Sequence, residues 1–176
     1  MARPRVISSV LMVLMFAVLV VASTTDMLYR KVFNWLTVPA ALVAIALNAT
    51  QGWPALKQSG SGLLIGLAIG IVFMLFFRFG GGDAKLFAVV GAFAGPAILA
   101  YTVLYGAVAG LPLALIVMYR RGVFGYTLKN FGFNVMHRAM GAGGSGIDAN
   151  SRAGRMPYAL AILIGAVVAV LVEGWQ

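Results

Sequence analysis

Two aspartates stand where a carboxyl group could do chemistry. Asp83 ends a run of glycines, Gly80-Gly81-Gly82, between the apolar stretches 62–77 and 86–95. A carboxylate at membrane depth is costly, so such a residue is a candidate functional residue. Asp26 directly follows the first apolar stretch. Because the chain has only four acidic residues, two beside predicted membrane segments suggest a single site shared by both.

The chemistry expected of this pair is general acid–base hydrolysis. Two carboxyl groups a few ångströms apart do not both ionise readily, so they share one proton. The ionised group can take a proton from water, while the protonated group polarises a peptide carbonyl. No cofactor or metal is expected, in keeping with a chain that has no cysteine and one histidine, His137. The alternative is two separate ion pairs, Asp26 with Arg30 and Asp83 with Lys85.

Four further residues are predicted to shape the site. Gly80 and Gly82 would let a substrate backbone approach closely, and the glycine run is expected to break helical backbone. Lys85 could extend its ammonium toward lipid phosphates, or it could favour the ionised form of Asp83. Asn34 is expected to cap the helix that follows it.

Composition determines which elements must position these residues. Hydrophobic residues make up 62% of the 176 residues and charged residues only 10%, against about 25% charged in soluble domains. The mean hydropathy is +0.98. We therefore predict an all-α polytopic membrane protein, one membrane-embedded domain over 1–176, with the lipid bilayer as partner. The formal charge of +9 is attributed to basic residues at membrane edges rather than to nucleic-acid binding.

The apolar pattern predicts about six transmembrane helices. A cleavable signal peptide is the alternative for the first of them. Glycines at 62, 66 and 70 recur every four residues, a pattern typical of close helix packing. The fourth helix is short for a bilayer, which suggests that the glycine run before it is recessed. The expected helices cover 6–24, 35–49, 62–79, 84–95, 97–119 and 157–172, with a cytoplasmic loop over 120–156.

The distribution of basic residues predicts the orientation. Ten of the 13 Lys and Arg residues fall in the connectors after helices one, three and five or at the edges of these connectors. Arg3, Arg5 and Lys57 fall on the other side. The positive-inside rule then places both aspartates at the cytoplasmic face of the inner membrane and both termini outside.

Family resemblance begins at the glycine run. Gly80-Gly81-Gly82-Asp83 matches the Gly-x-Gly-Asp signature of membrane aspartic proteases. Continued through Lys85-Leu86, with Gly91-Ala92 following, the string resembles the prepilin peptidases, or type IV leader peptidases. This resemblance implies that Asp83 is one of two catalytic aspartates.

The rest of the chain carries further parts of the resemblance, from Val6 to the sixth helix. The other catalytic aspartate of the family follows a transmembrane helix and precedes an Ile/Val-x-Asn segment. Asp26 and Val32-Phe33-Asn34 match that pattern. Pro157-Tyr158-Ala159 resembles a weaker family feature.

The resemblance implies an aspartic endopeptidase that removes the basic leader from prepilin-like proteins at the cytoplasmic face. Longer members carry an N-terminal soluble region with paired cysteines, linked to N-methylation. This chain has neither, so methyltransferase activity is not expected, and the chain looks like the short, peptidase-only branch, which includes enzymes for archaeal preflagellins.

Two other readings stay open. A presenilin-like protease also carries Gly-x-Gly-Asp but places both acids in mid-helix, whereas Asp26 is expected at a helix end. A small ion- or proton-coupled transporter would use the two acids near the bilayer centre and would show inverted repeats.

Overall fold

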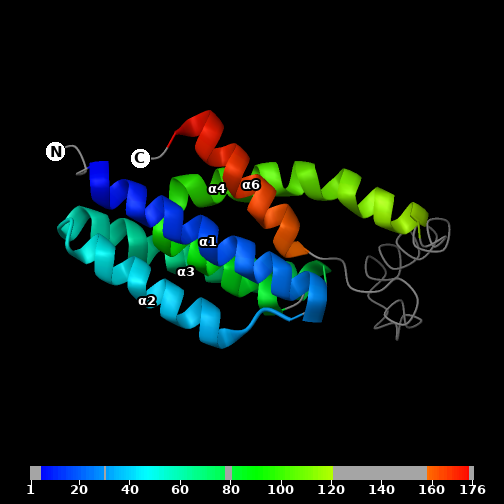
Figure 1. Ribbon diagram of the computed structural model, residues 1–176, viewed down its shortest axis with the longest axis horizontal. Coiled ribbons are helices and arrows are strands. Elements are labelled where there is room, and N and C mark those ends of the chain that lie inside the picture. Colours follow the sequence, from blue (N-terminus) through cyan, green and yellow to red (C-terminus); the bar gives the residue numbers. More distant parts are fainter. Residues whose placement is uncertain (1–4, 30, 78–80, 121–157, 175–176) are drawn as a thin grey trace. The chain divides into compact units, whose positions relative to one another are not determined.

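The computed structural model describes residues 5–29, 31–77, 81–120 and 158–174. Its elements within these ranges are all helices: α1 (Arg5–Tyr29), α2 (Asn34–Ala49), α3 (Trp53–Phe77), α4 (Gly81–Arg120) and α6 (Tyr158–Glu173) (Figure 1). The chain divides into two units, Met1–Ala109 with Pro157–Gln176, and Gly110–Met156. The first unit contains both aspartates and is described below.

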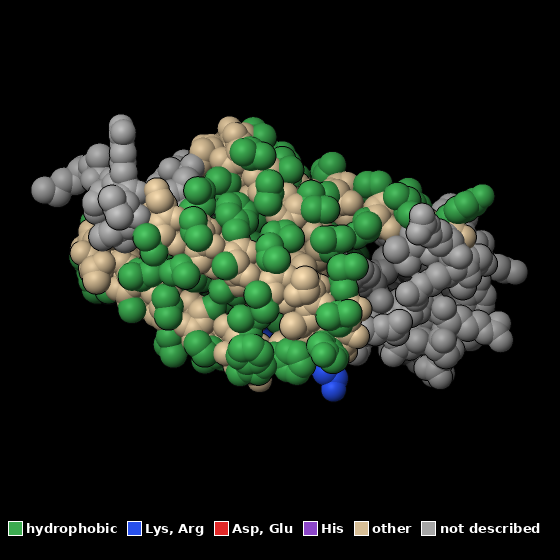
Figure 2. All heavy atoms as spheres, viewed as in Figure 1, with side chains coloured by type: hydrophobic (Ala, Val, Ile, Leu, Met, Phe, Trp, Pro, Cys, Tyr) green, Lys and Arg blue, Asp and Glu red, His purple; other side chains and the backbone are tan. Residues whose placement is uncertain are grey.

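Within the described residues, three stretches are long and apolar enough to cross a membrane: Ser9–Tyr29, Trp53–Met74 and Gly81–Leu113. The helices Asn34–Ala49 and Tyr158–Glu173 are apolar but shorter. Hydrophobic side chains cover most of the face seen in Figure 2, and a basic side chain lies at one edge. The regular elements of the described part are therefore all helices, and their apolar character indicates a membrane protein. The number of six spans stays a prediction.

The core of the first unit forms around one stripe of α1. Leu11, Met15, Leu19 and Ala22 are fully buried, and their spacing of three or four residues puts them on one face of a helix. Through its contacts α1 packs against both α6 and α2, and α2 packs against α3. The stripe continues after Ala22 to the position of Asp26, four residues further on.

The glycine pattern of α3 packs against α4, as its spacing predicts. A Cβ atom on Gly62 would overlap the carbonyl group of Gly91, and one on Gly66 would overlap the carbonyl of Phe87. A Cβ atom on Gly70 would overlap Ala84. Only glycine permits this backbone contact along about 12 Å of helix. The packing interpretation of these three glycines is confirmed.

A break at Gly95 divides α4 into two helical segments. Gly95 has φ 81° and ψ 177°, a conformation that residues with a Cβ rarely adopt. The next residue, Pro96, has no N–H to donate to the carbonyl of Ala92. That carbonyl accepts instead from Ser59 Oγ at 2.7 Å and from Asn48 Nδ2 at 3.3 Å. The break lies where the sequence predicts that one helix ends and the next begins.

Two helix boundaries differ from the sequence prediction. The first helix was expected to end at residue 24, but α1 continues to Tyr29. The hydroxyls of Thr24 and Thr25 donate to the carbonyls of Val21 and Ala22, so the polar side chains bond to their own helix and do not end it. The third helix begins at Trp53 rather than at residue 62. Buried Ser59 donates to α4 there, and this contact stabilises a segment whose composition suggests a turn.

Two local predictions were also wrong. Asn34 does not cap α2: it is the first helical residue, the cap position belongs to Phe33, and no side-chain capping bond forms. The glycine run does not break the helix throughout, because Gly81 and Gly82 lie in the first turn of α4. A helix start tolerates glycine since its first N–H groups have no intrahelical partner in any case.

Candidate functional site

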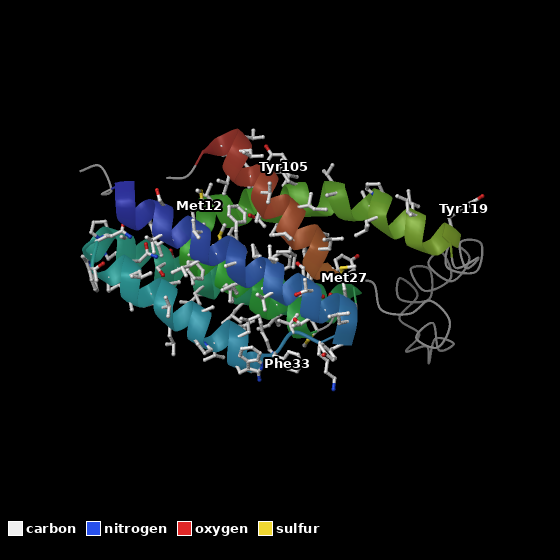
Figure 3. All side chains as sticks on the ribbon, in the orientation of Figure 1. Met12, Met27, Phe33, Tyr105 and Tyr119 are labelled. Carbon is white, nitrogen blue, oxygen red and sulfur yellow. The ribbon has the colours of Figure 1, made fainter. Side chains whose placement is uncertain are left out.

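Asp26 lies in the last two turns of α1, on the side of the helix that faces the core. It follows the buried residues Leu19 and Ala22 at helical spacing, and its own side chain is half-buried. Figure 3 labels its neighbour Met27 at this end of α1. The expectation that Asp26 stands in a polar connector is wrong, because the helix passes through it.

Asp83 lies in the first turn of α4 and is 8% exposed. Among the residues whose burial the structure describes, Asp83 is the one buried side chain that can carry a charge. The other buried polar side chains are those of Ser, Thr and Asn residues. Both Asp83 and Asp26 take part in a polar or electrostatic interaction within the chain. A buried ionisable group in an apolar helix is costly to keep and marks Asp83 as a candidate functional residue.

Two contacts and one electrostatic interaction place the ends of α1, α4 and α6 together. A Cβ atom on Gly82 would lie 3.0 Å from Cγ2 of Val32, so the start of α4 packs against the connector that follows α1. Ser23 Oγ donates to the carbonyl of Ala159 at 3.1 Å, which joins the end of α1 to the start of α6. Tyr158, beside Ala159, interacts electrostatically with Asp83. Asp26 and Asp83 therefore lie at the same end of the bundle.

The remaining predicted site residues lie near this end in different surroundings. Gly82 is half-buried, and the side chain of Val32 occupies the space next to it that a substrate backbone was expected to approach. Lys85 is half-buried two residues after Asp83, and positions i and i+2 do not face each other on a helix. Asn34 is exposed at the start of α2, two residues after Val32.

Several predicted features lie outside the described residues. They are Gly80, His137, Asp148, Pro157 and the loop 120–156 except for its first residue. Within the described ranges, no three or more His, Cys, Asp or Glu side chains gather as a metal site would require. The candidate site consists of two carboxyl groups and the polar groups around them.

Sequence reasoning missed the residues that join the helices. Ser23 is small and polar within an apolar helix, where a serine commonly bonds to its own backbone, so nothing in its position suggested a link to Ala159. Tyr158 belongs to a recognised segment, Pro157-Tyr158-Ala159, but its electrostatic interaction with Asp83 depends on the tertiary fold. Both contacts are long-range and leave no periodic signal in the sequence.

Comparison with known proteins gives a match to a family model. The model of the type IV leader peptidase family matches residues 13–115, a range that includes both aspartates. No curated protein and no solved structure matches the chain.

Proposed function

The chain belongs to the type IV leader peptidase family, and on this premise we propose that it is an aspartic endopeptidase that uses Asp26 and Asp83. The observation that supports this pair is that both aspartates lie at one end of the bundle. The Val32–Gly82 contact joins the start of α4 to the connector after α1, and the Ser23–Ala159 hydrogen bond joins α1 to α6 at the same end. The family match also favours a peptidase over a transporter. α1 ends at Tyr29, so Asp26 lies in the last turn of its helix rather than in mid-helix, a position that still argues against a presenilin-like protease.

The reaction is the hydrolysis of one peptide bond. The ionised carboxylate takes a proton from a water molecule, and the water oxygen attacks the scissile carbonyl carbon. The protonated carboxyl group donates to the carbonyl oxygen and so stabilises the tetrahedral intermediate. When the C–N bond breaks, a proton passes to the leaving amine, and the pair returns to its starting state with one shared proton. No covalent enzyme intermediate forms.

The helix ends suggest which carboxyl group carries the shared proton. Asp83 is in the first turn of α4, where the helix dipole favours a negative charge, whereas Asp26 is near the C-terminal end of α1, where the dipole disfavours it. Each effect is worth about 0.3–1 kcal/mol. We assign the ionised, water-activating role to Asp83 and the proton-donating role to Asp26.

The substrate class follows from the family: a prepilin-like protein with a short basic leader and an apolar segment after it. A reporter with this design and a leader that ends in glycine should be cleaved once by the purified protein in detergent. A reporter whose leader lysines and arginines are replaced by glutamine serves as the control and should be cleaved poorly. Failure to cleave any reporter of this class would contradict the proposed function.

We also propose that the site end of the bundle faces the cytoplasm. Lys31 lies in the connector at the site end, and Lys57 lies at the start of α3, over the ring of Trp53. Since the chain has no cysteine, Lys31→Cys and Lys57→Cys each introduce a single label. A membrane-impermeant thiol reagent applied to intact cells should label the Lys57→Cys variant only. Labelling of the Lys31→Cys variant alone would show the opposite orientation and would contradict this proposal.

A further inference from the structure

The start of α6 supplies a third polar side chain at the end of the bundle where the two aspartates lie. Tyr158 is the first residue of α6 and is half-buried. The family match ends at residue 115, so it does not include α6. The position of Tyr158 therefore has to be argued from the contacts of the helix itself.

Two sets of contacts fix the start of α6 within the first unit. The hydrogen bond from Ser23 holds the carbonyl of Ala159 against α1, one turn before Asp26. On the other side, α6 packs against the second segment of α4 through two glycines: Gly106 lies close to the carbonyl of Ala161, and a Cβ atom on Gly165 would meet the backbone of Gly106. Small residues on both helices permit this close approach.

The face of α6 that meets α4 includes Tyr158. Tyr158 precedes Ile162 by four residues and Gly165 by seven, which is the spacing of one helix face. Ile162 is 3% exposed, so this face is buried. Tyr158 is thus the polar end of an apolar contact face, next to a residue bonded to α1 and within electrostatic range of Asp83 on α4.

We propose that Tyr158 is a positioning residue of the protease site, whose hydroxyl group holds the carboxylate of Asp83 in the orientation that activates water. The inference rests on the proposed function, in which Asp83 is the ionised member of the pair. A phenol hydroxyl can donate one hydrogen bond to a carboxylate and still accept one. A hydrogen bond of this kind, to a charged acceptor, is stronger than one between neutral groups.

The ring and the hydroxyl of Tyr158 have separable roles. The ring fills the start of the α4–α6 contact, whereas the hydroxyl is the group that can act on Asp83. Tyr158→Phe removes only the hydroxyl and keeps the ring, so it tests the proposal without opening a cavity. Tyr105→Phe is the matched control: Tyr105 OH donates to Glu173 Oε1 at 3.3 Å and joins the same two helices at the opposite end of α6.

Cleavage of the prepilin-type reporter by detergent-purified protein gives the readout. For Tyr158→Phe we expect kcat to fall by about 10- to 100-fold, the range of a lost charge-assisted hydrogen bond of about 1.5–3 kcal/mol. KM should change by less than twofold, and the midpoint temperature of unfolding should change by less than about 2 °C. Tyr105→Phe should keep kcat within about twofold of wild type, since the hydroxyl it removes bonds to Glu173 at the other end of α6.

The outcomes separate this inference from the proposed function. If wild type does not cleave the reporter, the proposed function fails. If wild type cleaves and Tyr158→Phe cleaves equally fast, the role of Tyr158 is refuted while the function stands. A fall in kcat that is matched by Tyr105→Phe, or one that accompanies an equal loss of stability, would also overturn the proposal, because a merely structural tyrosine predicts that result.

Discussion

Gly70→Ala tests whether the packing of α3 against α4 positions Asp83. Gly70 lies against Ala84, the residue after Asp83, and a Cβ atom at position 70 would overlap both Cα and Cβ of Ala84. Carbon atoms pack at about 3.5–4.0 Å, so the two helices would have to move apart. Because Ala84 adjoins Asp83, this movement would displace the start of α4 and the carboxyl group with it.

The size of the effect follows from two opposing contributions. Extra volume forced into a packed contact costs about 1–3 kcal/mol. Replacing glycine by alanine within a helix stabilises the folded protein by about 0.5–1 kcal/mol. Gly70→Ala should therefore lower the free energy of unfolding by about 1–2 kcal/mol. A displacement of about 1 Å in a catalytic group can cost 100-fold in rate, so activity should fall far more than stability.

Two other glycines of α3 serve as matched controls. Gly60 has no atom within 4 Å of a Cβ position, so Gly60→Ala should raise stability by about 0.5–1 kcal/mol. Gly62 meets the carbonyl of Gly91 at the end of the contact remote from Asp83. Gly62→Ala should lose about as much stability as Gly70→Ala but keep more of its activity.

The assay combines equilibrium unfolding in mixed detergent micelles, followed by helical circular dichroism, with cleavage of the prepilin-type reporter. The expected order of stability is Gly60→Ala above wild type, with Gly62→Ala and Gly70→Ala below it. If Gly60→Ala is as destabilising as Gly70→Ala, contact with α4 is not the cause. If Gly70→Ala and Gly62→Ala lose equal activity, the contact at Ala84 does not position Asp83.

Two further substitutions test single interactions. Ser59→Ala removes the shorter of the two hydrogen bonds to the Ala92 carbonyl and should lower the free energy of unfolding by about 1 kcal/mol. The control Ser61→Ala removes an exposed hydrogen bond within its own helix and should change this free energy by less than about 0.5 kcal/mol. Equal losses would refute the role given to Ser59. Lys85→Met should lower the reporter cleavage rate without moving its pH profile, because helix geometry turns Lys85 away from Asp83; a displaced acidic limb would show instead that the ammonium acts on Asp83.

The packing of the bundle could be predicted where the sequence repeats at helical spacing. The glycines at 62, 66 and 70 gave the contact with α4 because such a pattern has one common physical cause. Gly95-Pro96 gave the break within α4 for a similar reason, since this pair cannot continue regular helical bonding. The hydrogen bonds that compensate the break, from Asn48 and Ser59, join distant segments and could not be read from composition.

The candidate site was predictable in its residue types and not in its surroundings. Scarcity of acidic residues and the glycine run singled out Asp26 and Asp83, but the sequence prediction ended the first helix at residue 24 and assigned Thr25 to the connector, whereas α1 continues to Tyr29. The threonine hydroxyls at this point bond within the helix instead. Tyr158 lies at this end of the bundle only because α6 returns to the end of α1, a tertiary contact that local patterns do not encode.

The central claim, that Asp26 and Asp83 act as one catalytic unit, is tested most directly by three variants assayed in parallel: Asp26→Asn, Asp83→Asn and the double substitution. Asparagine keeps the size of the side chain but cannot share a proton. Each single variant should insert, fold and lose reporter cleavage to background, and the double variant should be no worse than either one, since groups that act as a unit are not additive. Asp148→Asn is the control and should cleave like wild type. Near-normal cleavage by purified Asp26→Asn would contradict the account, because an Asp26 that forms only a local ion pair and has no catalytic role predicts that result.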